Sequence, residues 1–156
     1  MCKTLVAYFT TSSATEKTAE KLASLTGADL YEIKALKPYT DDDLNWTDPA
    51  SRSTMEMNDP ECRPEIDGKV ENMADYDTVY IGYPVWWGKA PRIIETFVSS
   101  YDFAGKTLRP FATSGGSKAE KSDEELHALV SDKAVWKEAK RLDKATDDEL
   151  KAFIAE

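Results

Sequence analysis

Short apolar runs recur along the sequence and limit the possible fold more than any other feature. LVAYF (5–9), TVYIG (78–82) and TLRPFAT (107–113) are rich in β-branched and aromatic residues. Continuous runs of this length are typical of strands that are buried on both faces of a parallel sheet. DLYEIK (29–34) is predicted as a further strand, and residues 134–142 as a weak fifth strand.

Helical patterns separate these runs. The segment after the first run ends at Gly27, a residue suited to a helix end. Pro91 is predicted at the first position of another helix. Two later helices are predicted to begin with capping boxes, formed by Ser122 with Glu125 and by Thr146 with Glu149. The apolar stripes are Ala19, Leu22, Ala23 and Thr26; Ile94, Phe97, Val98 and Tyr101; Leu126, Leu129 and Val130; and Leu150, Phe153 and Ile154.

Strands that alternate with helices indicate an α/β fold with a parallel sheet and right-handed crossovers. The chain has 156 residues, which is enough for one domain with a proper core. We therefore predict a single doubly wound domain over residues 1–156, in which helices cover a five-stranded parallel sheet.

Two segments do not follow this simple scheme. Pro110 lies inside the fourth predicted strand, where the sheet would normally use its N–H. We expect either an irregular strand there or a fifth strand that pairs only beyond the proline. Residues 38–66 contain four prolines and many acids, with a helix predicted over 49–57, capped by Asp48. The rest of this excursion is either a binding loop or a plain surface loop.

The net charge of −9 argues against nucleic acid or an anionic membrane as the main partner, because both require a basic face. The acidic surface suits either a partner with a basic face or simple solubility. Cys2 and Cys62 are sixty positions apart, and the chain has a single histidine, so neither a metal site nor a disulfide framework is expected. No apolar run reaches membrane-spanning length and no signal peptide is expected, so we predict a cytoplasmic protein.

Five hydroxyl residues crowd the junction between the first strand and its helix: Thr10, Thr11, Ser12, Ser13 and Thr15. A helix start needs only one capping oxygen. In an open parallel sheet, ligands bind beyond the carboxyl ends of the strands, and a helix N-terminus there favours an anion. The loop therefore indicates either a phosphate cradle without basic side chains or a cap within a polar loop. The sequence has no P-loop and no GxGxxG motif, so we expect neither an ATPase site nor a dinucleotide-binding site.

Two further loops follow strand ends of the same polarity. IGYPVWWGKAPR (81–92) carries two adjacent tryptophans, and TSGGSK (113–118) carries two glycines. The tryptophan rings would either stack on a flat ligand or both cap the core. The two glycines would let the backbone approach a ligand closely. Together with the hydroxyl loop, these loops suit a planar mononucleotide such as FMN. No acid–base pair lies in them, so no catalytic residue is predicted.

These segments resemble the flavodoxin family. YFTTSSATEKTA is similar to the family's phosphate loop, ENMADYDTVYIGYPVWWGKAP to its second flavin loop, and FAGKTLRPFATSGGSK to its third. CRPEI is similar to the Arg-Pro segment that often precedes the second loop. The resemblance covers nearly the whole chain. It implies a flavodoxin-like three-layer sandwich with a five-stranded parallel sheet in the order 2-1-3-4-5, and noncovalently bound FMN used for electron transfer.

The resemblance also implies which residues bind the flavin. The phosphate-binding positions are Thr10, Ser12, Ser13, Ala14 and Thr15. The positions along the isoalloxazine are Pro84, Val85, Trp86, Trp87 and Gly88, with Lys89 bordering them, and the far wall is Ser114, Gly115 and Gly116. Ser13 stands where the family usually has glycine, and Ala14 where asparagine is common.

Three functions remain open at this point. The leading one is an FMN-dependent electron carrier that meets a redox partner with a basic face. The second is an FMN-dependent reductase that takes hydride from NAD(P)H and passes it to a quinone or a similar acceptor. The third is a flavin-free interaction module of the same fold, which the departures at Ser13 and Ala14 motivate.

Overall fold

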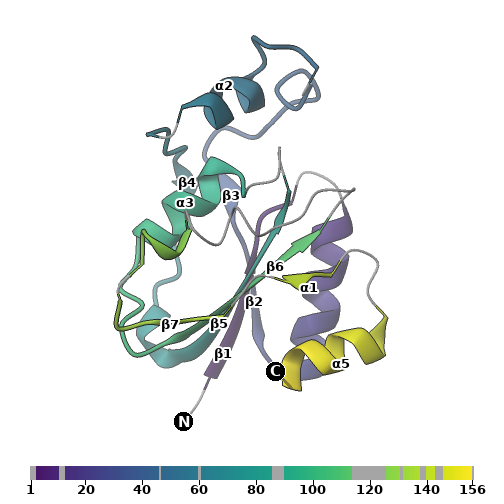
Figure 1. Cartoon of the computed structure of the whole chain (residues 1–156), viewed down its shortest axis with the longest axis vertical. Coiled ribbons are helices and arrows are strands. Elements are labelled where there is room, and N and C mark those ends of the chain that lie inside the picture. The colour runs from purple at the N-terminus through teal and green to yellow at the C-terminus, as the bar shows by residue number, and fades with distance from the viewer. Residues whose placement is uncertain are drawn as a thin grey trace.

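A parallel sheet forms the middle layer of the molecule, which is a computed structural model (Figure 1). The structure describes residues 3–10, 13–45, 47–59, 61–85, 90–113, 126–130, 132–137, 140–142 and 146–155. The sheet is built from β1 (Lys3–Tyr8), β2 (Asp29–Glu32), β5 (Tyr76–Pro84), β6 (Thr107–Thr113), β7 (Val135–Trp136) and β8 (Lys140–Arg141). Its order is β2-β1-β5-β6-β7, and β8 also pairs with β6. All of these pairings are parallel, which confirms the predicted order of five strand positions.

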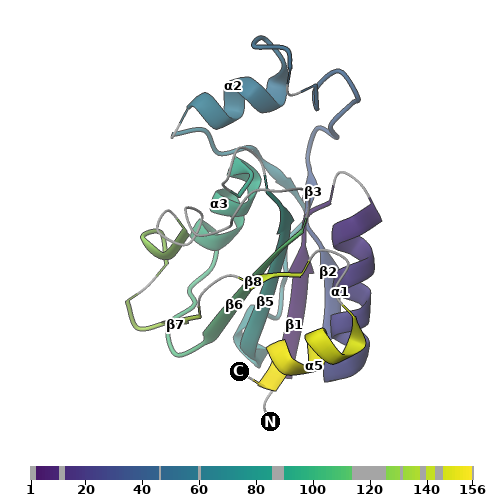
Figure 2. The same ribbon diagram turned by 45° about the vertical axis from the view of Figure 1, so that its right-hand side comes forward.

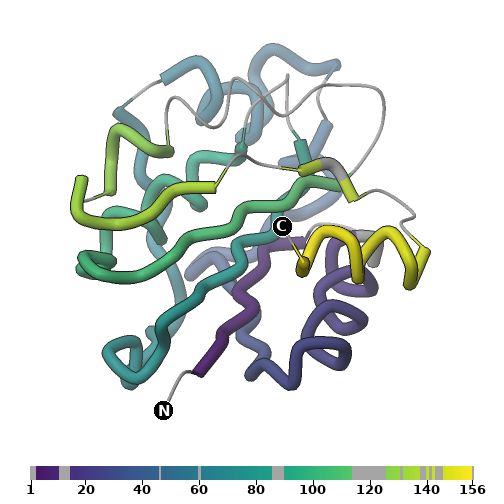
Figure 3. Tube along the Cα trace, turned by 60° about the horizontal axis from the view of Figure 1, so that its bottom comes forward, coloured from purple at the N-terminus to yellow at the C-terminus, as the bar shows by residue number. Residues whose placement is uncertain are grey.

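Helices cover both faces of the sheet. On one face lie α1 (Ser13–Thr26) and α5 (Asp147–Ala155), and on the other lies α3 (Arg92–Ser99) (Figures 1 and 2). Figure 3, in which the bottom of Figure 1 comes forward, shows α1 and α5 together on one side of the strands. None of the helices in the described part of the chain is long and apolar enough to cross a membrane.

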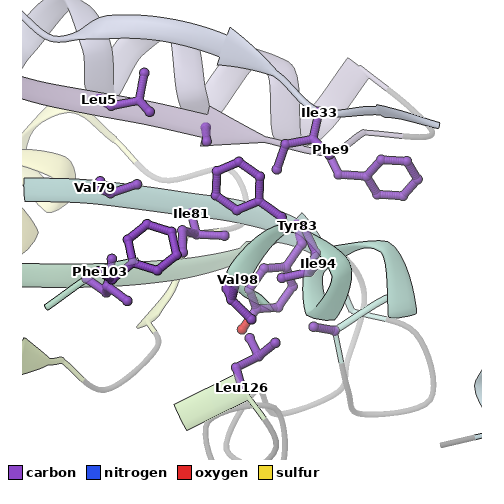
Figure 4. Close-up of a cluster of buried hydrophobic side chains, with 14 of the residues drawn as sticks. Leu5, Phe9, Ile33, Val79, Ile81, Tyr83, Ile94, Val98, Phe103 and Leu126 are labelled. Atoms are coloured by element: carbon purple, nitrogen blue, oxygen red, sulfur yellow. The ribbon is translucent and has the colours of Figure 1, made fainter. Parts of the chain in front are cut away.

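Each face of the sheet has its own apolar core. Ala19 and Leu22 of α1 pack with Leu150 and Phe153 of α5 against Val6 and its neighbours on one face. The larger core, on the α3 face, includes Leu5, Ile81, Tyr83, Ile94 and Phe103 (Figure 4). The predicted helix stripes are thus largely confirmed, and their innermost members are buried.

Helix ends follow the predicted signals with small shifts. Gly27 has a φ of 70°, the left-handed conformation expected at a helix end. The backbone N–H of Glu149 donates to Thr146 Oγ1 (3.2 Å), and the N–H of Thr146 donates to Glu149 Oε1 (3.3 Å), which confirms that capping box. Pro91 is the N-cap of α3 rather than its first helical residue, because the helix begins at Arg92. The predicted box at 122–125 lies outside the described residues.

The fifth strand position is split opposite Pro110. The carbonyls of Leu108 and Ala112 accept hydrogen bonds from the N–H groups of Lys137 (2.9 Å) and Leu142 (2.8 Å). Pro110 occupies the alternating position between them and has no N–H to offer. The pairing therefore divides into β7 before the proline and β8 after it, while β6 itself continues through Pro110 in register with β5. Neither of the two outcomes expected from the sequence is found.

The excursion after β2 is closed at its base by a short antiparallel ladder. β3 (Lys34–Ala35) pairs with β4 (Ile66–Asp67), and the N–H of Leu36 donates to the carbonyl of Glu65 (2.8 Å). The ladder encloses residues 36–65, nearly the same segment as the excursion predicted at 38–66, and from here on we use the name excursion for residues 36–65. It stands above the carboxyl edge of the sheet, on the side of α3 (Figures 1 and 2).

The helix of the excursion, α2 (Arg52–Asn58), begins later than predicted. Ser51 is its N-cap, and its side-chain oxygen accepts from the N–H of Thr54. Asp48 does not cap the helix. Its carboxylate accepts from the N–H of Ala50 (2.9 Å) and forms a turn before it. The predicted start at residue 49 is therefore wrong, because Asp48 satisfies a local turn instead of the helix.

Candidate functional site

The carboxyl ends of β1, β5 and β6 meet at one edge of the sheet. The N–H of Phe9, just past β1, donates to the carbonyl of Gly82 (2.9 Å), and the N–H of Val85 donates to the carbonyl of Thr113 (3.1 Å). Pro84 and Thr113 are register partners and both are buried. The three loops that the sequence singled out therefore leave the sheet side by side, as an open parallel sheet requires at a ligand-binding edge.

A hydrogen bond between two threonines joins the first turn of α1 to the end of β6. Thr15 Oγ1 and Thr113 Oγ1 are 2.6 Å apart, and each residue is only 1% exposed. A hydroxyl has one donor hydrogen, so one of the pair donates to the other and the acceptor keeps its own O–H. Thr15 is thus placed at the predicted edge, and its hydroxyl also links two elements in the interior.

Thr10 has an unused hydroxyl at the same edge. Its Oγ1 is buried and has no hydrogen-bond partner in the described part of the chain. A buried hydroxyl without a partner costs about 1–3 kcal/mol, so a ligand oxygen at this point would be stabilising. α1 begins three residues later, and the free N–H groups and positive dipole of its first turn favour an anion. This edge therefore fits a phosphate group.

The remaining predicted ligand residues fall into three groups. Val85 is half-buried and packs against the core of the α3 face. Ser13 and Ala14 belong to α1, with their side chains outside the described part. The other predicted positions lie outside the described residues: Ser12, Trp86, Trp87, Gly88, Lys89, Ser114, Gly115 and Gly116.

A cavity of about 470 Å³ opens beside Thr10, at the carboxyl ends of β1 and β2. Its floor comes from the ends of these strands, and its wall comes from the excursion through Pro38, Tyr39 and Leu44. Sequence reasoning did not assign these three residues to a site. The only signal was the proline-rich excursion itself, for which a binding loop was one of two interpretations.

Tyr39 is held in the cavity wall by contacts within the excursion. Its hydroxyl donates to Glu56 Oε1 (2.5 Å), and the guanidinium of Arg52 lies 3.9 Å from the centre of its ring. Arg52 also pairs with Glu56 (2.9 Å). Burial and the hydrogen bond to Glu56 raise the pKa of Tyr39 far above its usual range. The ring is therefore a fixed neutral surface.

Arg92 fastens the excursion to α3. It is 2% exposed, and its Nη1 lies 2.5 Å from Glu95 Oε1. Its Nε donates to the carbonyl of Glu56 (3.2 Å), and its Nη2 donates to the carbonyl of Met57 (2.8 Å). Arg63 pairs with the other oxygen of Glu95 (3.0 Å). Arg92, the last residue of the predicted flavin loop 81–92, is thus a buried anchor for the last turn of α2.

The described residues contain no group of three or more histidine, cysteine, aspartate and glutamate side chains that could hold a metal ion. Cys62 is a free thiol in the excursion, half-buried. Burial and the carboxylates of Glu56 and Asp59 raise its pKa.

Comparison with known proteins defines the family. The model described as Flavodoxin matches residues 3–156, so the chain belongs to the flavodoxin family. No curated protein matches the chain. A candidate flavoprotein from Bacteroides eggerthii is 45% identical, with a TM-score of 0.94, over 99% of this chain and 97% of that one. A second, from Bacteroides uniformis, is 44% identical, with a TM-score of 0.93, over 99% of both chains.

More distant structures share the fold. A flavoprotein from Lactobacillus acidophilus, solved in complex with FMN, is 24% identical, with a TM-score of 0.74, over 99% of both chains. At this identity the likeness concerns the fold alone.

Proposed function

We propose that this protein binds FMN at the edge formed by β1, β5 and β6 and carries electrons to and from another protein. The observation that carries the proposal is the buried hydroxyl of Thr10, which has no partner in the described part of the chain and lies just before the N-terminus of α1. Membership of the flavodoxin family and a structural neighbour that was solved with FMN support the choice of ligand.

In this proposal, the protein binds and orients the flavin. Thr10 Oγ1 and the free N–H groups of α1 hold the phosphate, and the O–H left over from the Thr15–Thr113 pair is a further donor. Pro84, the last residue of β5, and Val85 after it would lie beside the ring. Bound FMN supplies the redox chemistry, while the protein supplies position and electrostatics.

An NAD(P)H-dependent reductase is the second candidate, and turnover separates it from a carrier. If the protein is a carrier, the FMN-loaded protein should show no turnover of NADH or NADPH with quinones as acceptors. Turnover would favour the reductase.

Thr10→Val tests the phosphate site. A charge-assisted hydrogen bond contributes roughly 1.5–3 kcal/mol, so the Kd for FMN should rise about tenfold to a hundredfold. Riboflavin lacks the phosphate, so its Kd should change far less. The free energy of unfolding without ligand should not fall, because valine replaces a hydroxyl that has no partner among the described residues. Flavin fluorescence titrations and urea unfolding measure these quantities.

Thr78→Val is the matched control, because Thr78 lies near the amino end of β5, at the opposite edge of the sheet. It should leave both flavin affinities unchanged. Equal weakening of FMN and riboflavin by Thr10→Val would place the phosphate elsewhere. A protein that stays colourless in excess FMN would favour the flavin-free module instead.

A further inference from the structure

The cavity beside Thr10 has the size of a small-molecule site. Its volume of about 470 Å³ falls within the range of roughly 300–1,000 Å³ that is typical of ligand pockets. It lies over the ends of β1 and β2, at the outer side of β1, whereas the flavin edge proposed above lies over β1, β5 and β6. It is therefore a neighbouring space that shares Thr10 with the flavin edge and extends from there toward β2 and the excursion.

The interior of the cavity is apolar and partly aromatic. Phe9, Ile33 and Ala35 are buried in its floor, and Figure 4 shows Phe9 and Ile33 together at the ends of their segments. The rings of Phe9 and Tyr39 meet edge to face, with centroids 5.7 Å apart and planes at 66°. Leu44 completes the wall. Such a lining favours a ligand with a flat apolar body.

The charges that face the cavity are mainly negative. Glu16 comes from the first turn of α1 and Glu32 from the end of β2, and both are half-buried. Neither forms an ion pair with a cation in the described part of the chain. Lys34 and Asp67 also line the cavity, but they are exposed register partners of opposite charge and largely offset each other.

The neighbouring Tyr8 reports the same negative potential. Burial raises its pKa to about 12, together with the carboxylates of Glu32, Glu16 and Glu20. Glu16 and Glu32 thus act on one point from two different elements, at the side of the cavity where β1 ends.

We propose that this cavity binds a flat organic cation, whose rings pack against the Phe9–Tyr39 pair and Leu44 while its positive charge faces Glu16 and Glu32. A cation in a partly desolvated site gains more from a carboxylate than it would in water. Aromatic faces add a cation–π attraction. A flavin ring is a poor occupant, because it presents mainly acceptor atoms and would face the acceptor oxygens of two carboxylates.

A pair of planar probes that differ in charge tests this proposal. N-methylacridinium is a cation, and N-methylacridone is a neutral ring system of nearly the same shape. Isothermal titration calorimetry on the full-length, FMN-saturated protein should give a Kd for the cation at least about tenfold below that of the neutral probe. Equal affinities would overturn the proposal.

Charge variants locate the effect. In Glu16→Gln/Glu32→Gln, the affinity for the cation should fall about tenfold or more, to the level of the neutral probe, whose own affinity should stay the same. Glu20→Gln is the matched control, since Glu20 is an exposed residue of α1 that does not line the cavity. It should change the cation affinity by less than about twofold. A similar loss in both variants would mean that the cation responds only to the overall charge of the protein.

A cavity-filling variant checks the location independently of charge. Leu44→Trp should abolish binding of both probes while the affinity for FMN stays unchanged. Unchanged probe binding in a variant with a native-like circular dichroism spectrum would overturn the location. Addition of FMN to flavin-free protein should not displace the cation. Displacement would show that the cavity belongs to the flavin, and it would overturn this inference while leaving the proposed function intact.

Discussion

Gly82 is a position where the sheet leaves no space for a side chain. A Cβ atom there would lie 2.3 Å from Phe111 Cζ, and Phe111 is fully buried on the neighbouring strand. We expect Gly82→Ala to lower the free energy of unfolding by about 1–3 kcal/mol, because the phenyl ring must move within a packed core. Urea unfolding of the flavin-free protein measures this.

Phe111→Leu provides the second arm of a double-mutant cycle. Leucine removes the ring that the new methyl group would meet, so Gly82→Ala should cost less in the Phe111→Leu background than in the natural chain. A coupling of at least about 0.5 kcal/mol is expected for residues in direct contact. Additive effects within error would show that the backbone of β5, and not the ring, absorbs the change.

At this scale the sequence predicted that Thr10 and Thr15 lie past the end of the first strand, but not how they pair. The apolar run and the hydroxyl cluster were enough to place Thr10 and Thr15 beyond the end of a strand. The bond from Thr15 to Thr113 spans 98 positions, and only the folded sheet brings the two together. Glu16 and Tyr39 likewise show no local pattern that would mark them as neighbours of one cavity.

Among the elements, α2 depends on one buried side chain for its place. Arg92→Met should lower the free energy of unfolding by about 3–5 kcal/mol, the usual result when one partner of a buried ion pair is removed. Glu95, whose side chain is 5% exposed, would keep Arg63 as its ion-pair partner among the described residues, and two carbonyls at the end of α2 would lose the donor they have in Arg92. Urea unfolding and limited proteolysis within residues 36–65 measure the loss.

Arg52→Met is the control for this change. Arg52 belongs to α2, the helix that Arg92 anchors from α3, and it also pairs with a glutamate. Its side chain is 25% exposed, so the pair is partly screened and its loss should cost about 1 kcal/mol or less. If the two variants were equally stable and equally resistant to protease, Arg92 would not be the anchor of the excursion.

The sequence predicted the regular elements well because their signals are local. Periodicity marked α1, α3 and α5, and apolar runs marked β1, β5 and β6. Pro110 marked the right position because a proline removes one donor from the ladder, but the expected outcomes were wrong: β6 is continuous there, and the fifth strand position pairs on both sides of it. The start of α2 was missed because Asp48 and Ser51 are both good caps, and their choice depends on the turn that precedes the helix.

For the whole molecule, the net charge of −9 bears on how a partner would meet it. The composition alone led to the proposal of a redox partner with a basic face. Docking between opposite charges speeds association mainly through long-range attraction, which salt screens. The proposal therefore has a consequence that can be measured with a basic probe protein.

Reduced, FMN-loaded protein should transfer electrons to cytochrome c, a basic haem protein, at a rate that falls steeply with salt. The Debye length shrinks from about 10 Å at 0.1 M to about 3 Å at 1 M, so attraction between separated surfaces is nearly lost. Stopped-flow absorbance of the haem follows the rate. Ferricyanide, a small anionic acceptor, is the control, and its rate should rise with salt because screening removes repulsion from the acidic surface. If the rates of electron transfer to cytochrome c and to ferricyanide were both independent of salt over this range, the acidic surface would contribute to solubility and not to association with a partner.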